Sequence, residues 1–216
     1  MENIILFDLD GTLIDSTDAI VSTFHHAFKE MNYEFKGTDQ DIMDLIGHPL
    51  EIMFLELGVD DEIVWDFVHA YKNRYREIST EKTLLLDSAI EALENASKFA
   101  RLSVVTTKTG AYTIPLLEHF DILKYFEVIT GREHVENPKP HPEPILKTLD
   151  QMKIAKTSNI WMIGDTQLDI IAANGAGINS VGVLCGYGNE DSLKQYTSFI
   201  SKNAIEAVDL IKELSK

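Results

Sequence analysis

Short apolar runs recur along the chain, and polar residues or glycine follow each of them. The runs are Ile4 to Phe7, Leu102 to Thr106, Phe126 to Ile129, Ile160 to Ile163 and Val181 to Leu184. Helical spacing of apolar residues fills most of the intervals between them. Continuous apolar strands that alternate with helices are typical of a parallel sheet covered on both faces. Right-handed crossovers then predict a doubly wound, Rossmann-like α/β core.

One interval is much longer than a crossover needs, because the first run ends near Asp8 and the second begins near Leu102. Its apolar residues keep helical spacing, Thr38 with Asp41 resembles a capping box, and the turn residues Gly47 and Pro49 separate two helices. We therefore predict an inserted all-helical domain at residues 16–82. Residues 1–15 and 83–216 then form the α/β core, whose next helix is expected near residues 86–99.

An aromatic stripe in the insert, formed by Phe67, Tyr71 and Tyr75, has two interpretations. It could bind a cofactor, or it could pack between helices. Helical spacing favours packing in the core of the insert.

Composition narrows the function. The chain has 216 residues, and 19 Lys and Arg against 35 Asp and Glu give a net charge of -16. Such a charge disfavours binding to nucleic acid or to an anionic membrane surface, and an anionic substrate would need a bound cation. No apolar run is long enough to span a membrane, and the N-terminus does not resemble a signal peptide.

The single Cys185 excludes an internal disulfide and favours a cytoplasmic location. Cys185 itself is expected to be a small core residue. No heptad or repeat indicates an assembly, so a monomer is expected, with a dimer as the alternative.

Two carboxylates end the first strand, in Asp8-Leu9-Asp10-Gly11-Thr12. Side chains at i and i+2 of an extended segment point to the same side, so Asp8 and Asp10 repel each other unless a cation or a shared proton intervenes. An oxygen-only site suits a hard divalent ion such as Mg²⁺. A solvated acidic turn is the alternative.

Three further polar patches lie near strand ends or in a stiff loop. Thr106 and Thr107 close the second strand and could hold an anion, or could simply finish the strand. Lys139 lies among prolines that restrict its backbone. This segment could be a stiff loop that holds the lysine ammonium at a fixed point, or it could be an ordinary proline-rich surface loop. Asp165 and Asp169 follow the fourth strand and would share a helical face, or would cap that helix. Because ligands bind at the carboxyl edge of parallel sheets, the four patches together indicate an active site.

This set of motifs resembles the haloacid dehalogenase-like hydrolase superfamily. The matching segments are Asp8-Leu9-Asp10-Gly11-Thr12, Thr106 at a strand end, Lys139 in Lys-Pro-His-Pro, and Gly164-Asp165-Thr166-Gln167-Leu168-Asp169. The helical insert resembles the type 1 cap of that superfamily. Among its members the chain looks most like phosphoglycolate phosphatase and related phosphatases of small metabolites.

The resemblance implies catalytic roles. Asp8 would be the nucleophile that forms an aspartyl-phosphate, and Asp10 would protonate the leaving alkoxide and then accept a proton from water. Thr106, with the backbone N–H of Thr107, would bind phosphoryl oxygens, and Lys139 would stabilise their charge.

The resemblance also implies a Mg²⁺ site and a substrate class. Asp8, Asp165 and the backbone carbonyl of Asp10 would bind the ion, and Asp169 would support it. The expected reaction is hydrolysis of a small phosphorylated metabolite. A sugar phosphomutase, a pyrophosphatase and a non-catalytic acidic interaction protein are the alternatives. A dehalogenase is disfavoured because Asp10 is present.

Two departures from the family pattern and one histidine have roles that the sequence leaves open. The asparagine that usually follows the second-motif threonine is Thr107 here, and Asp87-Ser88 replaces a Pro-Gly that precedes the helix after the cap; Ser88 or Asp87 is still expected to cap that helix. His48, between Gly47 and Pro49, could bind a substrate carboxylate or hydroxyl, or could be an exposed turn residue.

Overall fold

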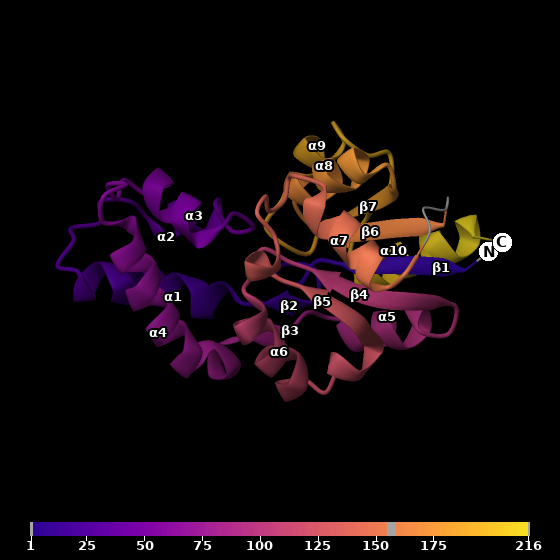
Figure 1. Cartoon of the computed structure of the whole chain (residues 1–216), viewed down its shortest axis with the longest axis horizontal. Coiled ribbons are helices and arrows are strands. Elements are labelled where there is room, and N and C mark those ends of the chain that lie inside the picture. The colour runs from indigo at the N-terminus through magenta and orange to yellow at the C-terminus, as the bar shows by residue number, and fades with distance from the viewer. Residues whose placement is uncertain (1, 155–158, 216) are drawn as a thin grey trace. The chain divides into compact units, whose positions relative to one another are not determined.

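The computed structural model describes residues 2–154 and 159–215 (Figure 1). The first and last residues of the expected core, Met1 and Lys216, and residues 155–158 lie outside the described residues. The chain divides into two compact units, of which one comprises Met1–Asp15 with Leu85–Lys216 and the other comprises Ser16–Leu84.

A parallel sheet forms the centre of the first unit. Its strands are β1 (Asn3–Phe7), β4 (Ala100–Val105), β5 (Phe126–Thr130), β6 (Ile160–Gly164), β7 (Asn179–Val183) and β8 (Ile200–Ser201). They pair in the order β5-β4-β1-β6-β7-β8, and every adjacent pair is parallel. The predicted doubly wound α/β core is confirmed. The short edge strand β8 was not predicted.

Helices cover both faces of this sheet (Figure 1). On one face lie α5 (Ala89–Ala96), α6 (Gly110–His119) and α10 (Ala204–Leu214), and on the other lie α7 (Glu143–Gln151) and α8 (Gln167–Ala176). Successive residues of a strand point to opposite faces, so Ile5 and Phe7 pack with the first group and Ile4 and Leu6 pack with the second. Because both faces are buried, the central strands β1 and β6 are nearly continuous apolar runs rather than alternating.

The second unit is helical, with α1 (Thr17–Glu30), α2 (Asp39–Met43), α3 (Leu50–Glu56) and α4 (Val64–Lys82). The predicted capping box is present, because Thr38 Oγ1 accepts from the backbone of Asp41, whose carboxylate accepts from the backbone of Thr38. Pro49 is the N-cap of α3 and directly precedes its first residue, Leu50, so Gly47 and Pro49 separate two helices as predicted.

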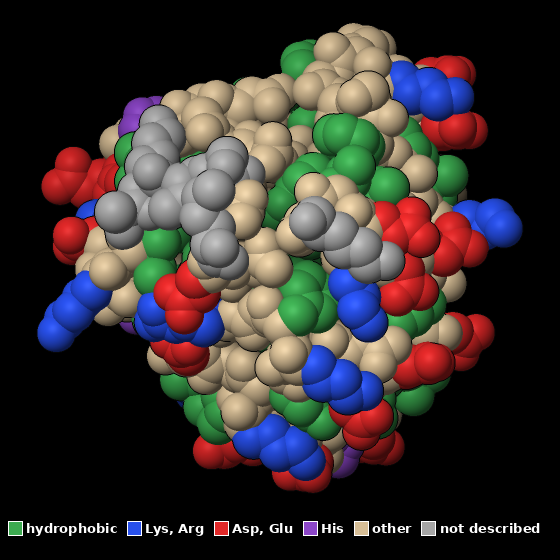
Figure 2. Space-filling view, turned by 90° about the vertical axis from the view of Figure 1, so that its right-hand side faces the viewer, with side chains coloured by type: hydrophobic (Ala, Val, Ile, Leu, Met, Phe, Trp, Pro, Cys, Tyr) green, Lys and Arg blue, Asp and Glu red, His purple; other side chains and the backbone are tan. Residues whose placement is uncertain are grey.

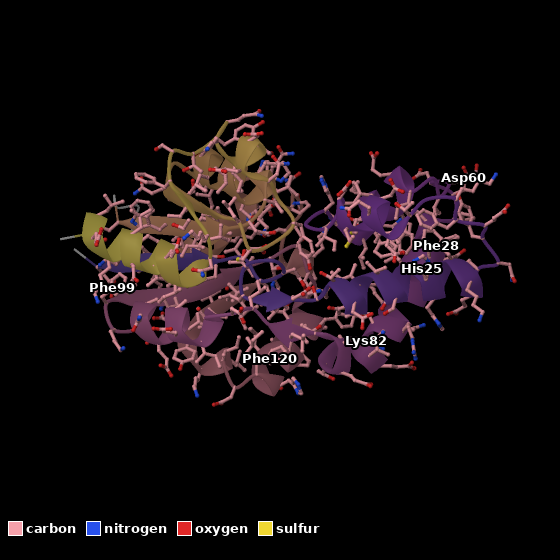
Figure 3. All side chains as sticks on the ribbon, turned by 180° about the vertical axis from the view of Figure 1, so that it is seen from behind. His25, Phe28, Asp60, Lys82, Phe99 and Phe120 are labelled. Atoms are coloured by element: carbon pink, nitrogen blue, oxygen red, sulfur yellow. The ribbon has the colours of Figure 1, made fainter. Side chains whose placement is uncertain are left out.

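Aromatic rings fill the interior of this helical unit. Phe67, Tyr71 and Tyr75 of α4 are buried, and their rings pack against Phe28 and Phe54 or against each other. Figure 3 shows Phe28 among these helices. The packing interpretation of the aromatic stripe is therefore confirmed.

The remaining elements are short. They are β2 (Ile14–Asp15) and β3 (Leu84–Leu85), which form a separate two-stranded sheet, the 3-10 helices η1 (Leu123–Tyr125) and η2 (Arg132–His134), and α9 (Glu190–Leu193). Before α5, Ser88 occupies the N-cap position with φ 67°, and its side chain makes no capping hydrogen bond. Of the two residues expected to cap this helix, Ser88 therefore takes the N-cap position without the side-chain hydrogen bond that a serine cap usually makes.

The charged side chains seen on one face of the molecule (Figure 2) agree with the acidic composition of the chain. On the face shown in Figure 2, lysine and arginine side chains lie among acidic ones rather than in one basic patch. Among the helices of residues 2–154 and 159–215, none combines the length and the apolarity that crossing a membrane requires.

Candidate active site

Parallel strands bring several of the predicted site residues together. Phe7 of β1 pairs with Val104 of β4 on one side and with Ile163 of β6 on the other. Asp8, Thr106 and Asp165 follow these paired residues by one or two positions, so all three emerge at the carboxyl edge of the sheet. The backbone N–H of Asp8 continues this pairing by donating to Ile163 O at 2.9 Å.

Lys139 is the centre of the site. Its ammonium donates to Asp8 Oδ1 at 2.7 Å, to Asp169 Oδ1 at 2.5 Å and to the carbonyl of Val105 at 3.0 Å. These contacts use all three ammonium protons, and the side chain is 3% exposed. Burial by itself lowers the pKa of Lys139, but the charges of Asp169 and Asp8 outweigh burial and raise that pKa above its usual value.

Asp169 supports Lys139 from the first turn of α8. Its Oδ1 binds the lysine, and its Oδ2 accepts from the backbone N–H of Thr166 at 3.1 Å and from the Thr166 hydroxyl at 2.8 Å. Asp169 therefore binds the start of the helix, as the capping interpretation predicts, and in addition holds the Lys139 ammonium.

Asp165 is enclosed by backbone that the sequence analysis did not single out. Its Oδ2 accepts from the backbone N–H of Tyr187 at 2.7 Å, and its Oδ1 accepts from the Thr12 hydroxyl at 3.3 Å. A Cβ atom on Gly186 or on Gly11 would collide with the Asp165 carboxylate, and Gly11 also has φ 79°. Glycine at both positions lets the backbone close around the acid. The Gly-Tyr-Gly sequence at 186–188 is the signal that could have revealed this loop.

Asp8 and Asp165 are hard to ionise in this environment. Burial raises the pKa of the Asp8 carboxyl to about 7, against an opposing effect of the Lys139 charge. Burial, with the charges of Asp8 and Asp169, also raises the pKa of Asp165 well above its usual value. If Asp8, Asp165 and Asp169 were all ionised, Lys139 would offset only one of their three charges.

A divalent cation fits this donor set. One oxygen each of Asp8, Asp165 and Asp169 lies within 4.8 Å of the others, and all three residues are buried. When ionised, these three acids and Lys139 carry a formal charge of -2, and buried charge is costly without a counterion. All the donors are oxygen, the chemistry that Mg²⁺ prefers.

Thr106 and Asp10 complete the edge of the site. Thr106 is buried, and its Oγ1 accepts from the backbone N–H of Lys108 at 3.1 Å, so its own proton can be donated elsewhere. Thr107 is half-buried beside it. The Asp10 carboxylate lies 3.2 Å from the ammonium of Lys108, a residue that the sequence analysis did not name as a candidate.

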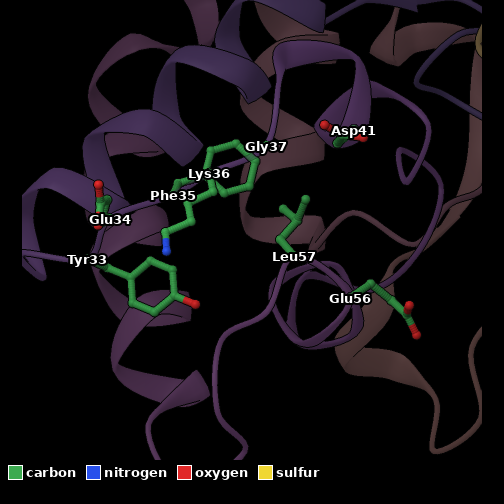
Figure 4. Close-up of a pocket in the computed structure, with 8 residues that line it drawn as sticks. All are labelled: Tyr33, Glu34, Phe35, Lys36, Gly37, Asp41, Glu56 and Leu57. Atoms are coloured by element: carbon green, nitrogen blue, oxygen red, sulfur yellow. The ribbon is translucent and has the colours of Figure 1, made fainter.

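His48 belongs to the helical unit and is half-buried. Burial lowers its pKa, partly offset by the charge of Glu56. A pocket of about 670 Å³ in the same unit is lined by residues 33–37 with Asp41, Glu56 and Leu57, and His48 is not part of it (Figure 4). Substrate binding by His48 stays a prediction.

Sequence comparison identifies the family that this geometry suggests. The family described as haloacid dehalogenase-like hydrolase matches residues 5–183, most of the chain. The chain therefore belongs to the haloacid dehalogenase-like hydrolase family, as its motifs predict.

Individual relatives are named for phosphate chemistry. The chain is 34% identical to "probable phosphatase IndB" of Dickeya dadantii, over 90% of this chain and 86% of that protein. It is 30% identical to pyrophosphatase PpaX of Halalkalibacterium halodurans, over 97% of this chain and 96% of that one. It is 29% identical to a phosphoglycolate phosphatase of Colwellia psychrerythraea, over 90% of each. These names support the predicted class of enzyme, a phosphoric monoester hydrolase.

A solved structure shares the whole fold. The haloacid dehalogenase-like family hydrolase from Streptococcus pneumoniae superposes with a TM-score of 0.86 at 27% identity, and the match covers 97% of this chain and 98% of that one.

Proposed function

We propose that the protein is a Mg²⁺-dependent phosphatase of a small phosphorylated metabolite and that it acts through an aspartyl-phosphate on Asp8. The single observation that carries this proposal is the buried group of Asp8, Asp165, Asp169 and Lys139, in which carboxylates outnumber the cation. Membership of the family supports it.

Asp8 and Asp165 would hold the metal ion, together with the backbone carbonyl of Asp10, and Asp169 would support the site through Lys139. When bound, Mg²⁺ supplies a Lewis acid that offsets the charge of the carboxylates and of the phosphoryl group. The low exposure of the site strengthens each of these electrostatic interactions relative to water.

In the first half-reaction, a carboxylate oxygen of Asp8 attacks phosphorus while the bond from phosphorus to the alcohol oxygen breaks. Asp10 gives a proton to that oxygen, so the alcohol leaves neutral. Lys139 faces Asp8, where the transferred phosphoryl group gathers charge, and the Thr106 hydroxyl with the Thr107 N–H would bind the phosphoryl oxygens.

In the second half-reaction, water attacks the phosphorus of the aspartyl-phosphate. The Asp10 carboxylate takes the proton from this water, the bond from Asp8 to phosphorus breaks, and inorganic phosphate leaves. Asp8 and Asp10 are then restored to their starting states.

The substrate class follows the relatives. A phosphoglycolate-like monoester is our first choice, because a phosphoglycolate phosphatase matches over 90% of this chain. Pyrophosphate is the second, because a relative at 30% identity is a named pyrophosphatase. The helical segment 16–82 would act as the cap that recognises the leaving group, with His48 as a candidate contact. A cytoplasmic location and a monomeric state stay predictions from the sequence.

The test is a panel of phosphate esters and pyrophosphate, assayed for released phosphate with Mg²⁺ and with EDTA. Hydrolysis is expected only with the metal. Asp8→Asn should abolish turnover, whereas Asp209→Asn, at an exposed position of α10, is the matched control and should retain it. Turnover by the folded Asp8→Asn variant, or full activity in EDTA, would contradict the proposal. An isomeric sugar phosphate as product in place of free phosphate would indicate a phosphomutase.

A further inference from the structure

Lys108 and Asp10 form an ion pair that the proposed chemistry has not used. The ammonium lies 3.2 Å from Asp10 Oδ1, and the two side chains are only 9% and 12% exposed. Water and salt screen a pair at such low exposure far less than they screen a surface pair. The pair can therefore hold one oxygen of Asp10 in a fixed place.

The sheet brings these two residues together. They follow the neighbouring strands β1 and β4, in which Phe7 pairs with Val104. Asp10 lies three residues beyond the first of these residues and Lys108 lies four beyond the second. Each therefore emerges at the same edge of the sheet, and the lysine needs to cross only the space between adjacent strands.

The backbone of Lys108 is itself anchored. Its N–H donates to Thr106 Oγ1 at 3.1 Å, and its carbonyl accepts from the N–H of Arg132 at 3.2 Å. A Cβ on Gly131 would lie 2.7 Å from that carbonyl, so the close approach depends on glycine. An anchored backbone reduces the conformational entropy that the lysine loses when it pairs.

We propose that Lys108 is a positioning residue that directs the Asp10 carboxyl group at the oxygen of the departing alcohol. This inference rests on the proposed function. Lys108 holds the Asp10 carboxyl group through Oδ1, and that carboxyl group carries the proton to be transferred. As the bond from Asp8 to phosphorus forms and the bond to the alcohol oxygen breaks, the proton moves from Asp10 to that oxygen. The carboxylate that remains lies against the ammonium, which therefore favours the transfer. In the second half-reaction the same carboxylate accepts the proton of water.

The leaving group gives a readout that a structural role would not change. A phenol as acidic as p-nitrophenol departs without much help, whereas an alkyl alcohol needs a well-placed acid. The experiment compares kcat/KM for p-nitrophenyl phosphate, for glycerol phosphate with its uncharged alcohol, and for phosphoglycolate. Using kcat/KM confines the comparison to the steps up to departure of the alcohol.

For Lys108→Met, we expect the ratio of kcat/KM for glycerol phosphate to that for p-nitrophenyl phosphate to fall at least about ten-fold, since a placed general acid contributes roughly 100-fold or more. Lys108→Arg should restore part of the ratio. Asp10→Asn should lower it too, and adding Lys108→Met to Asp10→Asn should lower it no further, because the lysine acts through the acid. Lys124→Met, which removes an exposed lysine paired with Asp121, is the matched control.

Two results would overturn the inference. An equal loss on p-nitrophenyl and glycerol phosphates would mean that Lys108 is structural, and a loss confined to phosphoglycolate would mean that it binds a substrate anion. If the wild-type protein hydrolyses none of the esters with Mg²⁺, the proposed function fails instead, and this outcome is distinct from either.

Discussion

Replacing Asp8 by Asn should stabilise the metal-free protein while it abolishes activity. In the folded chain, burial raises the pKa of Asp8 from 3.8 to about 7, despite the nearby Lys139 ammonium. Asparagine keeps the shape of the protonated acid and an oxygen that can accept from Lys139, but it never carries the charge. The variant therefore removes the cost of ionising a buried carboxyl group.

The sign of the pH effect follows from the direction of the shift. Because the folded pKa lies above the unfolded one, the folded state binds the Asp8 proton more tightly. The resulting stabilisation is complete below about pH 4 and is lost as the pH rises through about 7. At neutral pH, the ionised residue should cost on the order of 4 kcal/mol relative to an uncharged one.

The assay is urea unfolding in EDTA at pH 5 and pH 8. The advantage of Asp8→Asn over wild type should grow by roughly 2–3 kcal/mol between these two pH values. With Mg²⁺ present, the stability advantage of Asp8→Asn over wild type should shrink or reverse, because an ion bound to the folded wild type stabilises it. The reasoning would be refuted if Asp8→Asn were less stable than wild type at pH 8 in EDTA and if the stabilities of the two proteins changed equally with pH.

Three further variants test other parts of the structure. Ser88→Gly should raise the free energy of unfolding by about 0.5 kcal/mol in urea unfolding, because φ 67° strains a residue with a Cβ and glycine adopts it freely. Thr166→Val removes the hydroxyl that donates to Asp169, and should lower that free energy by about 1 kcal/mol in the same assay. Gly186→Ala forces a methyl group against the Asp165 carboxylate, and should weaken Mg²⁺ binding at least about ten-fold by calorimetry. An unchanged free energy of unfolding in Ser88→Gly or in Thr166→Val would contradict the reason given for that variant. Unchanged Mg²⁺ affinity in Gly186→Ala would do the same.

The core was predictable because its strands are buried on both faces. Such strands are apolar runs, and the observed β1, β4, β5, β6 and β7 lie within about two residues of the predicted ones. The edge strand β8 has only Ile200 and Ser201, too short to give a pattern. The capping box of Thr38 and Asp41 was predictable because its contacts are local in sequence.

The candidate site was predictable only in part, for a related reason. Asp8, Thr106 and Asp165 stand at the ends of apolar strands, so strand prediction alone places them at one edge. Lys108 could not be predicted as a site residue, because its ion-pair partner Asp10 lies about a hundred positions away in the sequence. The two meet only because β1 and β4 are neighbouring strands. The loop at residues 186–188 resembles any glycine-rich turn until Asp165 is seen inside it.

The left-handed backbone of Ser88 was also not predictable from the sequence, because the neighbouring residues do not indicate a positive φ. The Asp87-Ser88 pair departs from the family pattern, but its left-handed backbone is visible only in the structure. Glycine would adopt this conformation without the strain that a Cβ atom adds.

The most direct measurement of the central claim is a rapid acid quench after mixing the Mg²⁺-loaded protein with a radiolabelled phosphate ester. A phosphoryl group esterified to Asp8 should label the peptide that contains this residue, survive acid, and be released by hydroxylamine, and Asp8→Asn should remain unlabelled. A wild-type protein that turns over substrate without ever carrying this label, or an Asp8→Asn variant that carries it, would contradict the account.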